Sequence, residues 1–304
     1  SVKAQRAELE KEIADLQEQK RILRVARPFI WNIEFAEIFF DRGGFDIIIG
    51  NPPYVRQEEI GAPSGELAPG EYKNALLEMV RFDFPDYFKS GGRNPSRRSD
   101  LYTYFYIRSL RLLNPKGVHV FICSNSWLDV GYGAWLQEFF LRRAPLYFVI
   151  DNHARRSFTR ADINTVITVA GAPEMVDENH IIRFVALKKP FEDMVLSENL
   201  LEIEQATTTL RDDRFRVFPI TAGELLQEGG EVAQELAQQT NSRTVEARID
   251  QIGRYVGDKW GGKYLRAPDI FFTVLEKGKG KLVRLGEIAE VKFGIKTGAN
   301  DFFY

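Results

Sequence analysis

The residues with the clearest chemical potential are Asn51-Pro52-Pro53-Tyr54, which follow a short apolar run at 45–49. Two consecutive prolines remove two backbone N–H donors and fix φ, so this turn is stiff and rich in carbonyl acceptors. The side-chain oxygen of Asn51 and the carbonyl of Pro52 can accept the two hydrogens of an exocyclic amino group. Tyr54 adds a flat ring for stacking on the attached ring. The tetrapeptide is therefore a candidate site for a planar amine, and the alternative is a simple turn after a strand.

The elements that must position this turn alternate between strands and helices. The run at 45–49 is bounded by Gly50 and Pro52, which predicts a buried parallel strand with ligands beyond its carboxyl end. We expect a first core element over 31–40, a helix over 101–113, a turn over 114–117 and a strand over 118–123. A helix around 135–141 and strands over 147–151 and 165–170 follow. This rhythm predicts an α/β fold.

The remaining segments have weaker patterns. Residues 1–26 carry leucine and isoleucine near helical spacing, which predicts an amphipathic helix. It either forms a coiled-coil surface or packs on its own parent protein, and the absence of sustained heptads favours packing. Residues 56–99 read as a polar loop and residues 190–260 as a charged, mostly helical connector. A new unit is expected near 265, with a helix over 269–275 and a strand-like alternation over 282–292.

Composition limits the classes of function. A chain of 304 residues with 44% hydrophobic and 28% charged residues can form a full core, and the formal net charge of −2 means that nucleic-acid contacts must come from local patches. The single cysteine, Cys123, excludes a disulfide framework and fits a reducing cytoplasm. The three histidines have no companions at metal-ligand spacing, so no metal site is expected. No apolar stretch approaches the length of a membrane span.

The whole segment 31–55 resembles the N6-adenine DNA methyltransferases of large restriction–modification polypeptides, type IIG and related, which carry an Asn-Pro-Pro-Tyr loop. The resemblance implies a partial Rossmann-like, S-adenosylmethionine-dependent methyltransferase sheet. It also implies double-stranded DNA as the substrate, S-adenosylmethionine as the cofactor, and catalysis by the residues Asn51, Pro52, Pro53 and Tyr54. The target adenine would be flipped out of the duplex. Its amino group would lie against Asn51 and Pro52.

The same resemblance implies cofactor-binding residues. In the family, an aromatic residue early in the helix after the loop lies against the cofactor adenine, which here would be Tyr102 or Phe105. For Phe105, a role in the core alone is an equal alternative. Glu34 is expected at the edge that flanks the cofactor, although Glu37 competes for that role.

A further block, residues 158–166, resembles the turn that presents an aromatic ring to the flipped base. Phe158 occupies that position, opposite Tyr54. Arg155, Arg156 and Arg160 surround it and would contact DNA phosphates, or alternatively form a solvated basic turn.

The family's glycine-rich cofactor loop does not occur upstream of Asn51. We therefore expect a piece of a longer polypeptide, with the remaining domains of the parent as partners and weak or no cofactor binding by this piece alone. The expected units are a helix at 1–26, the catalytic part at 27–189, a connector at 190–264 and the start of a target-recognition domain at 265–304. Two alternatives are a DNA-binding or scaffold fragment without activity, and a methyltransferase acting on a glutamine amide or an RNA base amine.

Overall fold

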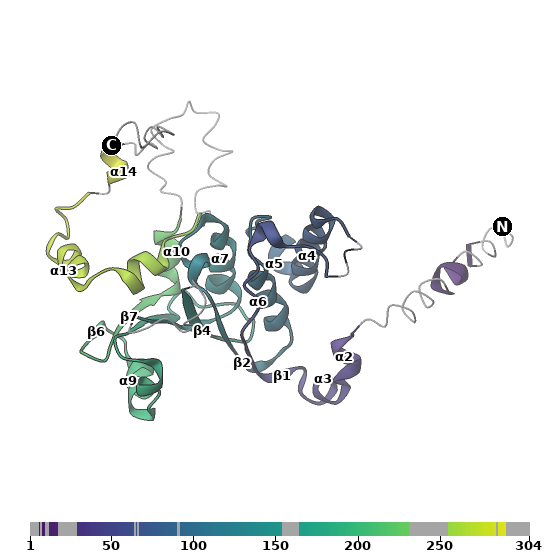
Figure 1. Ribbon diagram of the computed structural model, residues 1–304, viewed down its shortest axis with the longest axis horizontal. Coiled ribbons are helices and arrows are strands. Elements are labelled where there is room, and N and C mark those ends of the chain that lie inside the picture. Colours follow the sequence, from purple (N-terminus) through teal and green to yellow (C-terminus); the bar gives the residue numbers. More distant parts are fainter. Residues whose placement is uncertain are drawn as a thin grey trace, which may run out of the picture.

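A seven-stranded mixed sheet forms the centre of the molecule, in the order β1-β2-β4-β3-β5-β7-β6 (Figure 1). This computed structural model describes residues 6, 8–9, 12–17, 29–63, 65, 67–89, 92–153, 164–230, 255–283 and 285–289. The strands are β1 Phe45–Gly50, β2 Leu113–Ser124, β3 Leu146–Asn152, β4 Thr165–Gly171, β5 Ile181–Leu187, β6 Leu210–Arg211 and β7 Phe215–Thr221.

Five of these strands run in the same direction, and β6 is one of them because β6 and β5 are both antiparallel to β7. β1 pairs parallel with β2, and β3 pairs parallel with β5. β4 lies between β2 and β3 and is antiparallel to both, so β2 and β3 also share a direction. The carboxyl ends of β1, β2, β3 and β5 therefore lie along one edge of the sheet, where ligands of α/β proteins commonly bind.

One face of the sheet is covered by helices α6 (Leu101–Arg111) and α7 (Ala134–Arg143) (Figure 1). In α6, the residues at positions 102, 106 and 110 recur every four positions and are all buried, as expected for one helical face. Tyr106 of that face meets Phe121 of β2 and Phe140 of α7, with ring centroids 5.0 and 5.5 Å apart. This aromatic core holds the elements around the carboxyl edge. Helices α4 (Pro69–Asp83), α5 (Pro85–Lys89) and α10 (Ala222–Glu228) extend the layer.

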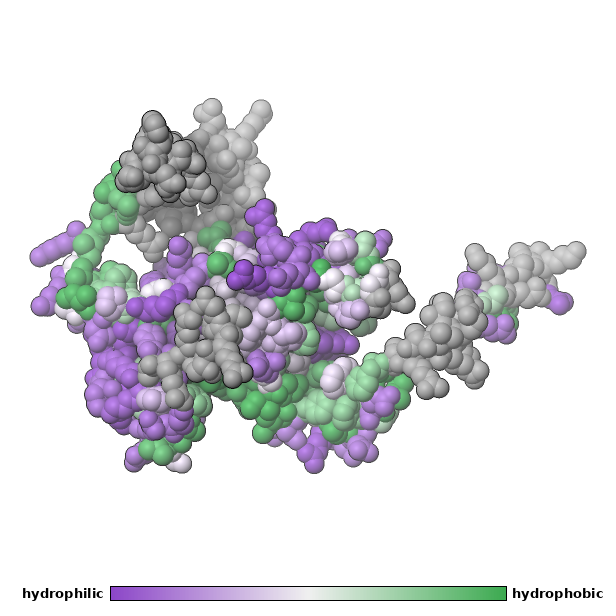
Figure 2. All heavy atoms as spheres, in the orientation of Figure 1, coloured by the Kyte–Doolittle hydropathy of each residue, from purple (hydrophilic) through white to green (hydrophobic). Residues whose placement is uncertain are grey.

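The described residues cover only part of the opposite face. α8 (Phe191–Met194) and α9 (Ser197–Gln205) belong to a second, smaller apolar cluster with β5 and β7. On β1, however, Ile47 and Ile49 are 67% and 78% exposed. Apolar residues gather on the surface near β1 and α3 (Ala36–Arg42), as Figure 2 shows. The prediction of a parallel strand is confirmed, but the prediction that it is buried is wrong, because an apolar run does not distinguish a central strand from an edge strand.

The expected loop over 56–99 is wrong. This segment forms α4 and α5, which begin at Pro69 and Pro85. Proline interrupts a helix in its interior, but it is well suited to the first helical turn, where its missing N–H would have no partner. The prolines therefore mark helix starts here, and Leu77 and Val80 of α4 are buried in the main core.

The expected helical connector over 190–260 is also wrong in part, because residues 210–221 add β6 and β7 to the same sheet. The expected boundary near 265 falls inside the packed core. Tyr264 and Leu265, in the π-helical segment Gly261–Arg266, are buried. Arg216 of β7 is buried too, and it donates hydrogen bonds to the carbonyls of Leu265 and Ala267. A buried guanidinium thus ties this late segment to the sheet.

Other expectations agree with the structure. The predicted helices over 101–113, 135–141 and 269–275 correspond to α6, α7 and α13 (Asp269–Lys277), and the strands over 118–123, 147–151 and 165–170 correspond to β2, β3 and β4. The turn expected at 114–117 is instead part of β2. The segment 282–292, expected to be strand-like, contains a short helix, α14 (Leu285–Ile288). The expected first core element, α2 (Trp31–Glu34) and α3, contains no fully buried residue.

Residues 12–17 are helical, and Leu9, Ile13 and Leu16 are exposed on the described part of that N-terminal segment. None of the helices among the described residues combines the length and the apolar character needed to cross a membrane. The mixed α/β architecture confirms the predicted fold class.

Candidate functional site

A pocket with a volume of about 220 Å³ opens beyond the carboxyl ends of β1 and β2. Its walls come from the loop after β1, the start of α6, the end of β2 and the residue before β4. The lining side chains are almost all polar. They are Tyr54, Arg56, Asp100, Tyr102, Ser124, Asn125, Ser126 and Asn164.

The loop after β1 leaves the sheet under a steric constraint. A Cβ at Gly50 would lie 2.9 Å from the ring of Phe121, which itself packs against His119 at a centroid distance of 4.1 Å. Glycine therefore allows β1 to pass close to β2 at the point where the loop begins. Beyond it, Pro52 is buried, whereas Asn51 and Pro53 are exposed.

The side chain of Asn51 makes no hydrogen bond to any residue that the structure describes, and it does not line the pocket. Its amide is therefore not used to hold the loop together. An exposed amide next to a buried proline, at the carboxyl edge of the sheet, is available for a ligand.

Tyr54 is held in a defined orientation at the pocket. Its hydroxyl donates a hydrogen bond to the carbonyl of Ile122 in β2, at 3.1 Å, and its ring packs half-buried against the main core. Burial raises the pKa of Tyr54 to about 12, so the hydroxyl stays protonated and remains a donor at neutral pH. The ring is fixed while part of it still faces the pocket.

Asp100 links the loop to the helix layer. One carboxylate oxygen accepts a hydrogen bond from the backbone N–H of Gln57 at 3.0 Å, and the other accepts one from the Tyr132 hydroxyl at 2.7 Å. The hydroxyls of Tyr132 and Tyr102 lie 2.9 Å apart. Burial raises the pKa of both tyrosines, which keeps them protonated. This chain of contacts joins the loop after β1 to the start of α6 and fixes one wall of the pocket.

The end of β2 supplies a second set of polar groups. The Ser124 and Ser126 hydroxyl oxygens lie 2.9 Å apart, and the backbone N–H of Asn125 donates to the carbonyl of Asn164 at 3.0 Å. Sequence reasoning did not identify these residues, nor Arg56 or Asp100. The available signal was their position, because Ser124–Ser126 follow directly after a predicted strand that is parallel to β1.

The structure brings together some predicted site residues and not others. Tyr54 and Tyr102 both line the pocket, but Phe105 does not and is 42% exposed on α6. Glu34 is exposed on α2. The neighbouring Trp31 contacts Phe45 at the start of β1, which is the end of the strand away from the pocket.

Glu37 is also exposed, on α3, and like Glu34 it does not line the pocket. Phe158, Arg155, Arg156 and Arg160 lie outside the described residues. Their roles, like those of the other predicted site residues, stay predictions.

The chemistry of the pocket suits a polar organic ligand. Its hydroxyls and amides provide neutral hydrogen-bond donors and acceptors, and one guanidinium and one carboxylate provide a charged donor and a charged acceptor. Within the described part of the chain, no three His, Cys, Asp or Glu side chains are grouped as metal ligands.

A protein-family model matches the part of the chain that contains the tetrapeptide. Residues 2–158 match the model of a family described as Eco57I restriction-modification methylase. The type II methyltransferase M.PaeR7I of Pseudomonas aeruginosa is 36% identical over 109 residues, which cover 36% of this chain and 16% of the relative. M.BstVI of Geobacillus stearothermophilus is 30% identical over 114 residues, covering 38% of this chain and 17% of the relative. The chain thus spans about a sixth of the length of these two relatives.

Among solved structures, the type IIG restriction endonuclease BpuSI is similar with a TM-score of 0.44 and 18% identity, over 67% of this chain and 22% of that one. The family match covers just over half of the 304 residues and includes the tetrapeptide, Asp100 and the end of β2. The chain belongs to the Eco57I restriction-modification methylase family.

Proposed function

We propose that the protein containing this chain methylates adenine at N6 in double-stranded DNA, with S-adenosylmethionine as the methyl donor, as part of a restriction–modification system. The observation that carries the proposal is the exposure and side-chain contacts of the tetrapeptide at the carboxyl end of β1. Asn51 is exposed without a described partner, Pro52 is buried, and the ring of Tyr54 is held at the polar pocket. Family membership favours DNA as the substrate.

Each residue of the tetrapeptide has a role in this proposal. The side-chain oxygen of Asn51 and the carbonyl of Pro52 accept the two hydrogens of the adenine amino group. These acceptors draw the nitrogen lone pair out of conjugation with the ring, which makes the nitrogen a better nucleophile. Tyr54 stacks on one face of the flipped base, and Phe158 is proposed for the other face. Flipping costs a few kcal/mol of unstacking, and stacking on these rings offsets part of that cost.

The described residues fit only one side of a site for S-adenosylmethionine. The partly exposed ring of Phe105 offers a surface for an adenine, and the pocket offers polar groups. However, β1 is the edge strand of the sheet, and no described strand lies beyond it to form the other side of the site. When bound, the cofactor supplies an electrophilic methyl group, and this chain contributes the acceptors and the ring that orient the amine.

The test is Asn51→Ala in the full parent protein. Loss of a preorganised acceptor should reduce methyl transfer to DNA by about 10²–10³-fold while DNA affinity changes little. Incorporation of labelled methyl groups measures the rate, and nucleoside analysis of the digested product identifies N6-methyladenine. Asn179→Ala is the matched control, because Asn179 is exposed in the turn before β5, at the other end of the sheet.

Methyl transfer by the Asn51→Ala protein at the wild-type rate would contradict the proposed role of the tetrapeptide. Methylated glutamine or methylated RNA, in place of methylated DNA, would assign the amine site to a different substrate.

A further inference from the structure

A second pocket, with a volume of about 700 Å³, adjoins the first. Tyr132 lines it, and the Tyr132 hydroxyl bonds to Asp100, which lines the first pocket. The two pockets therefore share the Tyr132–Asp100 contact as a wall. The second pocket is lined by Arg93, Asn94, Ser96, Arg97, Arg98, Gly131, Tyr132 and Trp135.

The loop that carries the three arginines is firmly attached to the core. Ser99 is fully buried and accepts a hydrogen bond from the indole nitrogen of Trp135 at 2.9 Å. Pro95 is buried, and Arg93 donates to the carbonyl of Tyr255 at 2.6 Å. The backbone N–H of Ser99 donates to the carbonyl of Ser96 at 3.1 Å. These contacts place the loop without using the guanidinium groups of Arg97 and Arg98.

Arg97 and Arg98 are exposed, and within the described ranges neither side chain forms an ion pair or hydrogen bond. The residues that line the second pocket include three arginines and no carboxylate. In a chain with a formal net charge of −2, this is a local concentration of positive charge. The nearby carboxylate of Asp100 is already engaged by Gln57 and Tyr132.

We propose that Arg97 and Arg98 form a phosphate-binding surface, which holds the DNA backbone next to the nucleotide presented to the first pocket. This inference rests on the proposed function. Guanidinium groups bind phosphate oxygens in a bidentate manner, and such contacts position a protein on the duplex without reading its sequence. The rigid loop reduces the entropy lost on binding. The shared wall places these contacts beside the first pocket, which Tyr54 of the tetrapeptide lines.

The test is the double variant Arg97→Ala/Arg98→Ala in the full parent protein. Two lost phosphate contacts should lower DNA affinity about tenfold or more near physiological salt, and should reduce the slope of log K against log salt by about 2. The loss should be the same for specific and non-specific duplexes. Arg111→Ala/Lys116→Ala is the matched control, because it removes the same charge from exposed positions at the other end of the sheet.

Several results would overturn the inference. One is an unchanged salt slope in Arg97→Ala/Arg98→Ala. If the wild-type protein methylates DNA in the same experiments, that result contradicts the phosphate surface but not the proposed function. Another is an equal loss in the control variant. Tighter binding of an RNA duplex than of a DNA duplex of the same length, lost in the same variant, would assign the surface to RNA. If the alanine variant folds poorly, Arg97→Gln/Arg98→Gln should show the slope reduced by about 2, and Arg97→Lys/Arg98→Lys should keep the wild-type slope. A wild-type protein that neither binds nor methylates DNA would defeat both proposals.

Discussion

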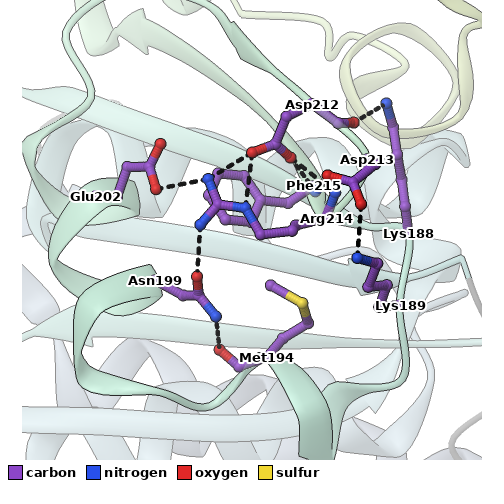
Figure 3. A network of polar contacts seen from close by, with 9 residues as sticks. All are labelled: Lys188, Lys189, Met194, Asn199, Glu202, Asp212, Asp213, Arg214 and Phe215. Carbon is purple, nitrogen blue, oxygen red and sulfur yellow. Dashed lines mark hydrogen bonds and ion pairs between the residues drawn. The ribbon is translucent and has the colours of Figure 1, made fainter.

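Two arginine-bearing turns of this molecule differ in how their charges are used. In the turn before β7, Arg214 donates to Asn199, Glu202 and Asp212 through all three of its side-chain nitrogens (Figure 3). In the loop before α6, Arg97 and Arg98 have no such partners among the described residues. Both turns lie at the surface and both contain arginines.

The partners of Arg214 show a structural role. Asn199 and Glu202 belong to α9, so the guanidinium joins that helix to the strand turn beside β7. Asp212 also accepts hydrogen bonds from the backbone N–H groups of Arg214 and Phe215, at 2.8 and 2.9 Å. This cluster satisfies its own polar groups and leaves few for a ligand. Arg97, Arg98 and Asn51 instead keep side-chain donors and acceptors available for a ligand. Mutations near these residues should therefore affect function, whereas mutations in the Arg214 cluster should affect stability.

After Asn51→Ala, the largest effect is expected for Tyr54→Ala. Removing the ring should weaken capture of the flipped base by about 1–3 kcal/mol, if stacking resembles that in single-strand binders. The fluorescence of 2-aminopurine at the target position measures base extrusion, and we expect less of it. Phe158→Ala should act in the same direction. Tyr54→Phe is the control, because it keeps the ring and loses only the hydroxyl, which donates to Ile122. It should retain most of the extrusion, and an equal defect would assign the effect to the hydroxyl and not to stacking.

A smaller effect on function is expected for Asp100→Ala, because Asp100 positions the loop through Gln57 and the wall through Tyr132. The backbone N–H of Gln57 would lose its acceptor, at a cost of about 1–3 kcal/mol. We expect methyl transfer to fall about tenfold, mainly in kcat, while DNA affinity is kept. Asp100→Asn retains an acceptor oxygen and should recover part of the rate. A loss confined to thermal stability, with normal kcat, would reduce Asp100 to a structural residue.

The smallest effect is expected for Asp212→Ala, and it should appear in stability alone. Burial opposes ionisation of Asp212, but the N–H of Phe215 and the Arg214 side chain outweigh it and hold the pKa of Asp212 below its usual range. Loss of the carboxylate should lower the free energy of unfolding by about 1 kcal/mol at neutral pH. Chemical denaturation measures this, and methyl transfer should be unchanged. A large activity loss would contradict the proposed division between the two turns.

The pH dependence of that contribution follows from the sign of the shift. A carboxyl group whose pKa is lower in the folded state contributes stability above its unfolded pKa, near 3.9. The contribution is lost as pH falls through the lower folded value. The Asp212→Ala protein should therefore differ from wild type at neutral pH and converge with it in acid. A difference that grows in acid would have the wrong sign.

Local patterns predicted the elements around the candidate site well. The strand at β1, the helix α6, the strand β2 and the turn at Asn51 all depend on short-range signals, namely apolar periodicity and the backbone limits of proline and glycine. The helices α4 and α5 were missed because proline occurs both in loops and at first helical positions. β7 was missed because it contains charged Arg216, whose burial is possible only with acceptors from residues 264–269.

The sequence by itself determined that a stiff, acceptor-rich turn follows a strand, since this depends on adjacent residues and their covalent geometry. Only the tertiary structure decided which side chains complete the site. Tyr132 reaches Asp100 and Tyr102, about thirty residues away, because α6 and the segment before α7 pack on one face of the sheet. Likewise, the side chain of Arg214 has hydrogen-bond partners and that of Arg97 has none among the described residues, although both arginines lie in turns. A hydrogen bond depends on where distant segments are placed, and that placement is set by burial of the shared core.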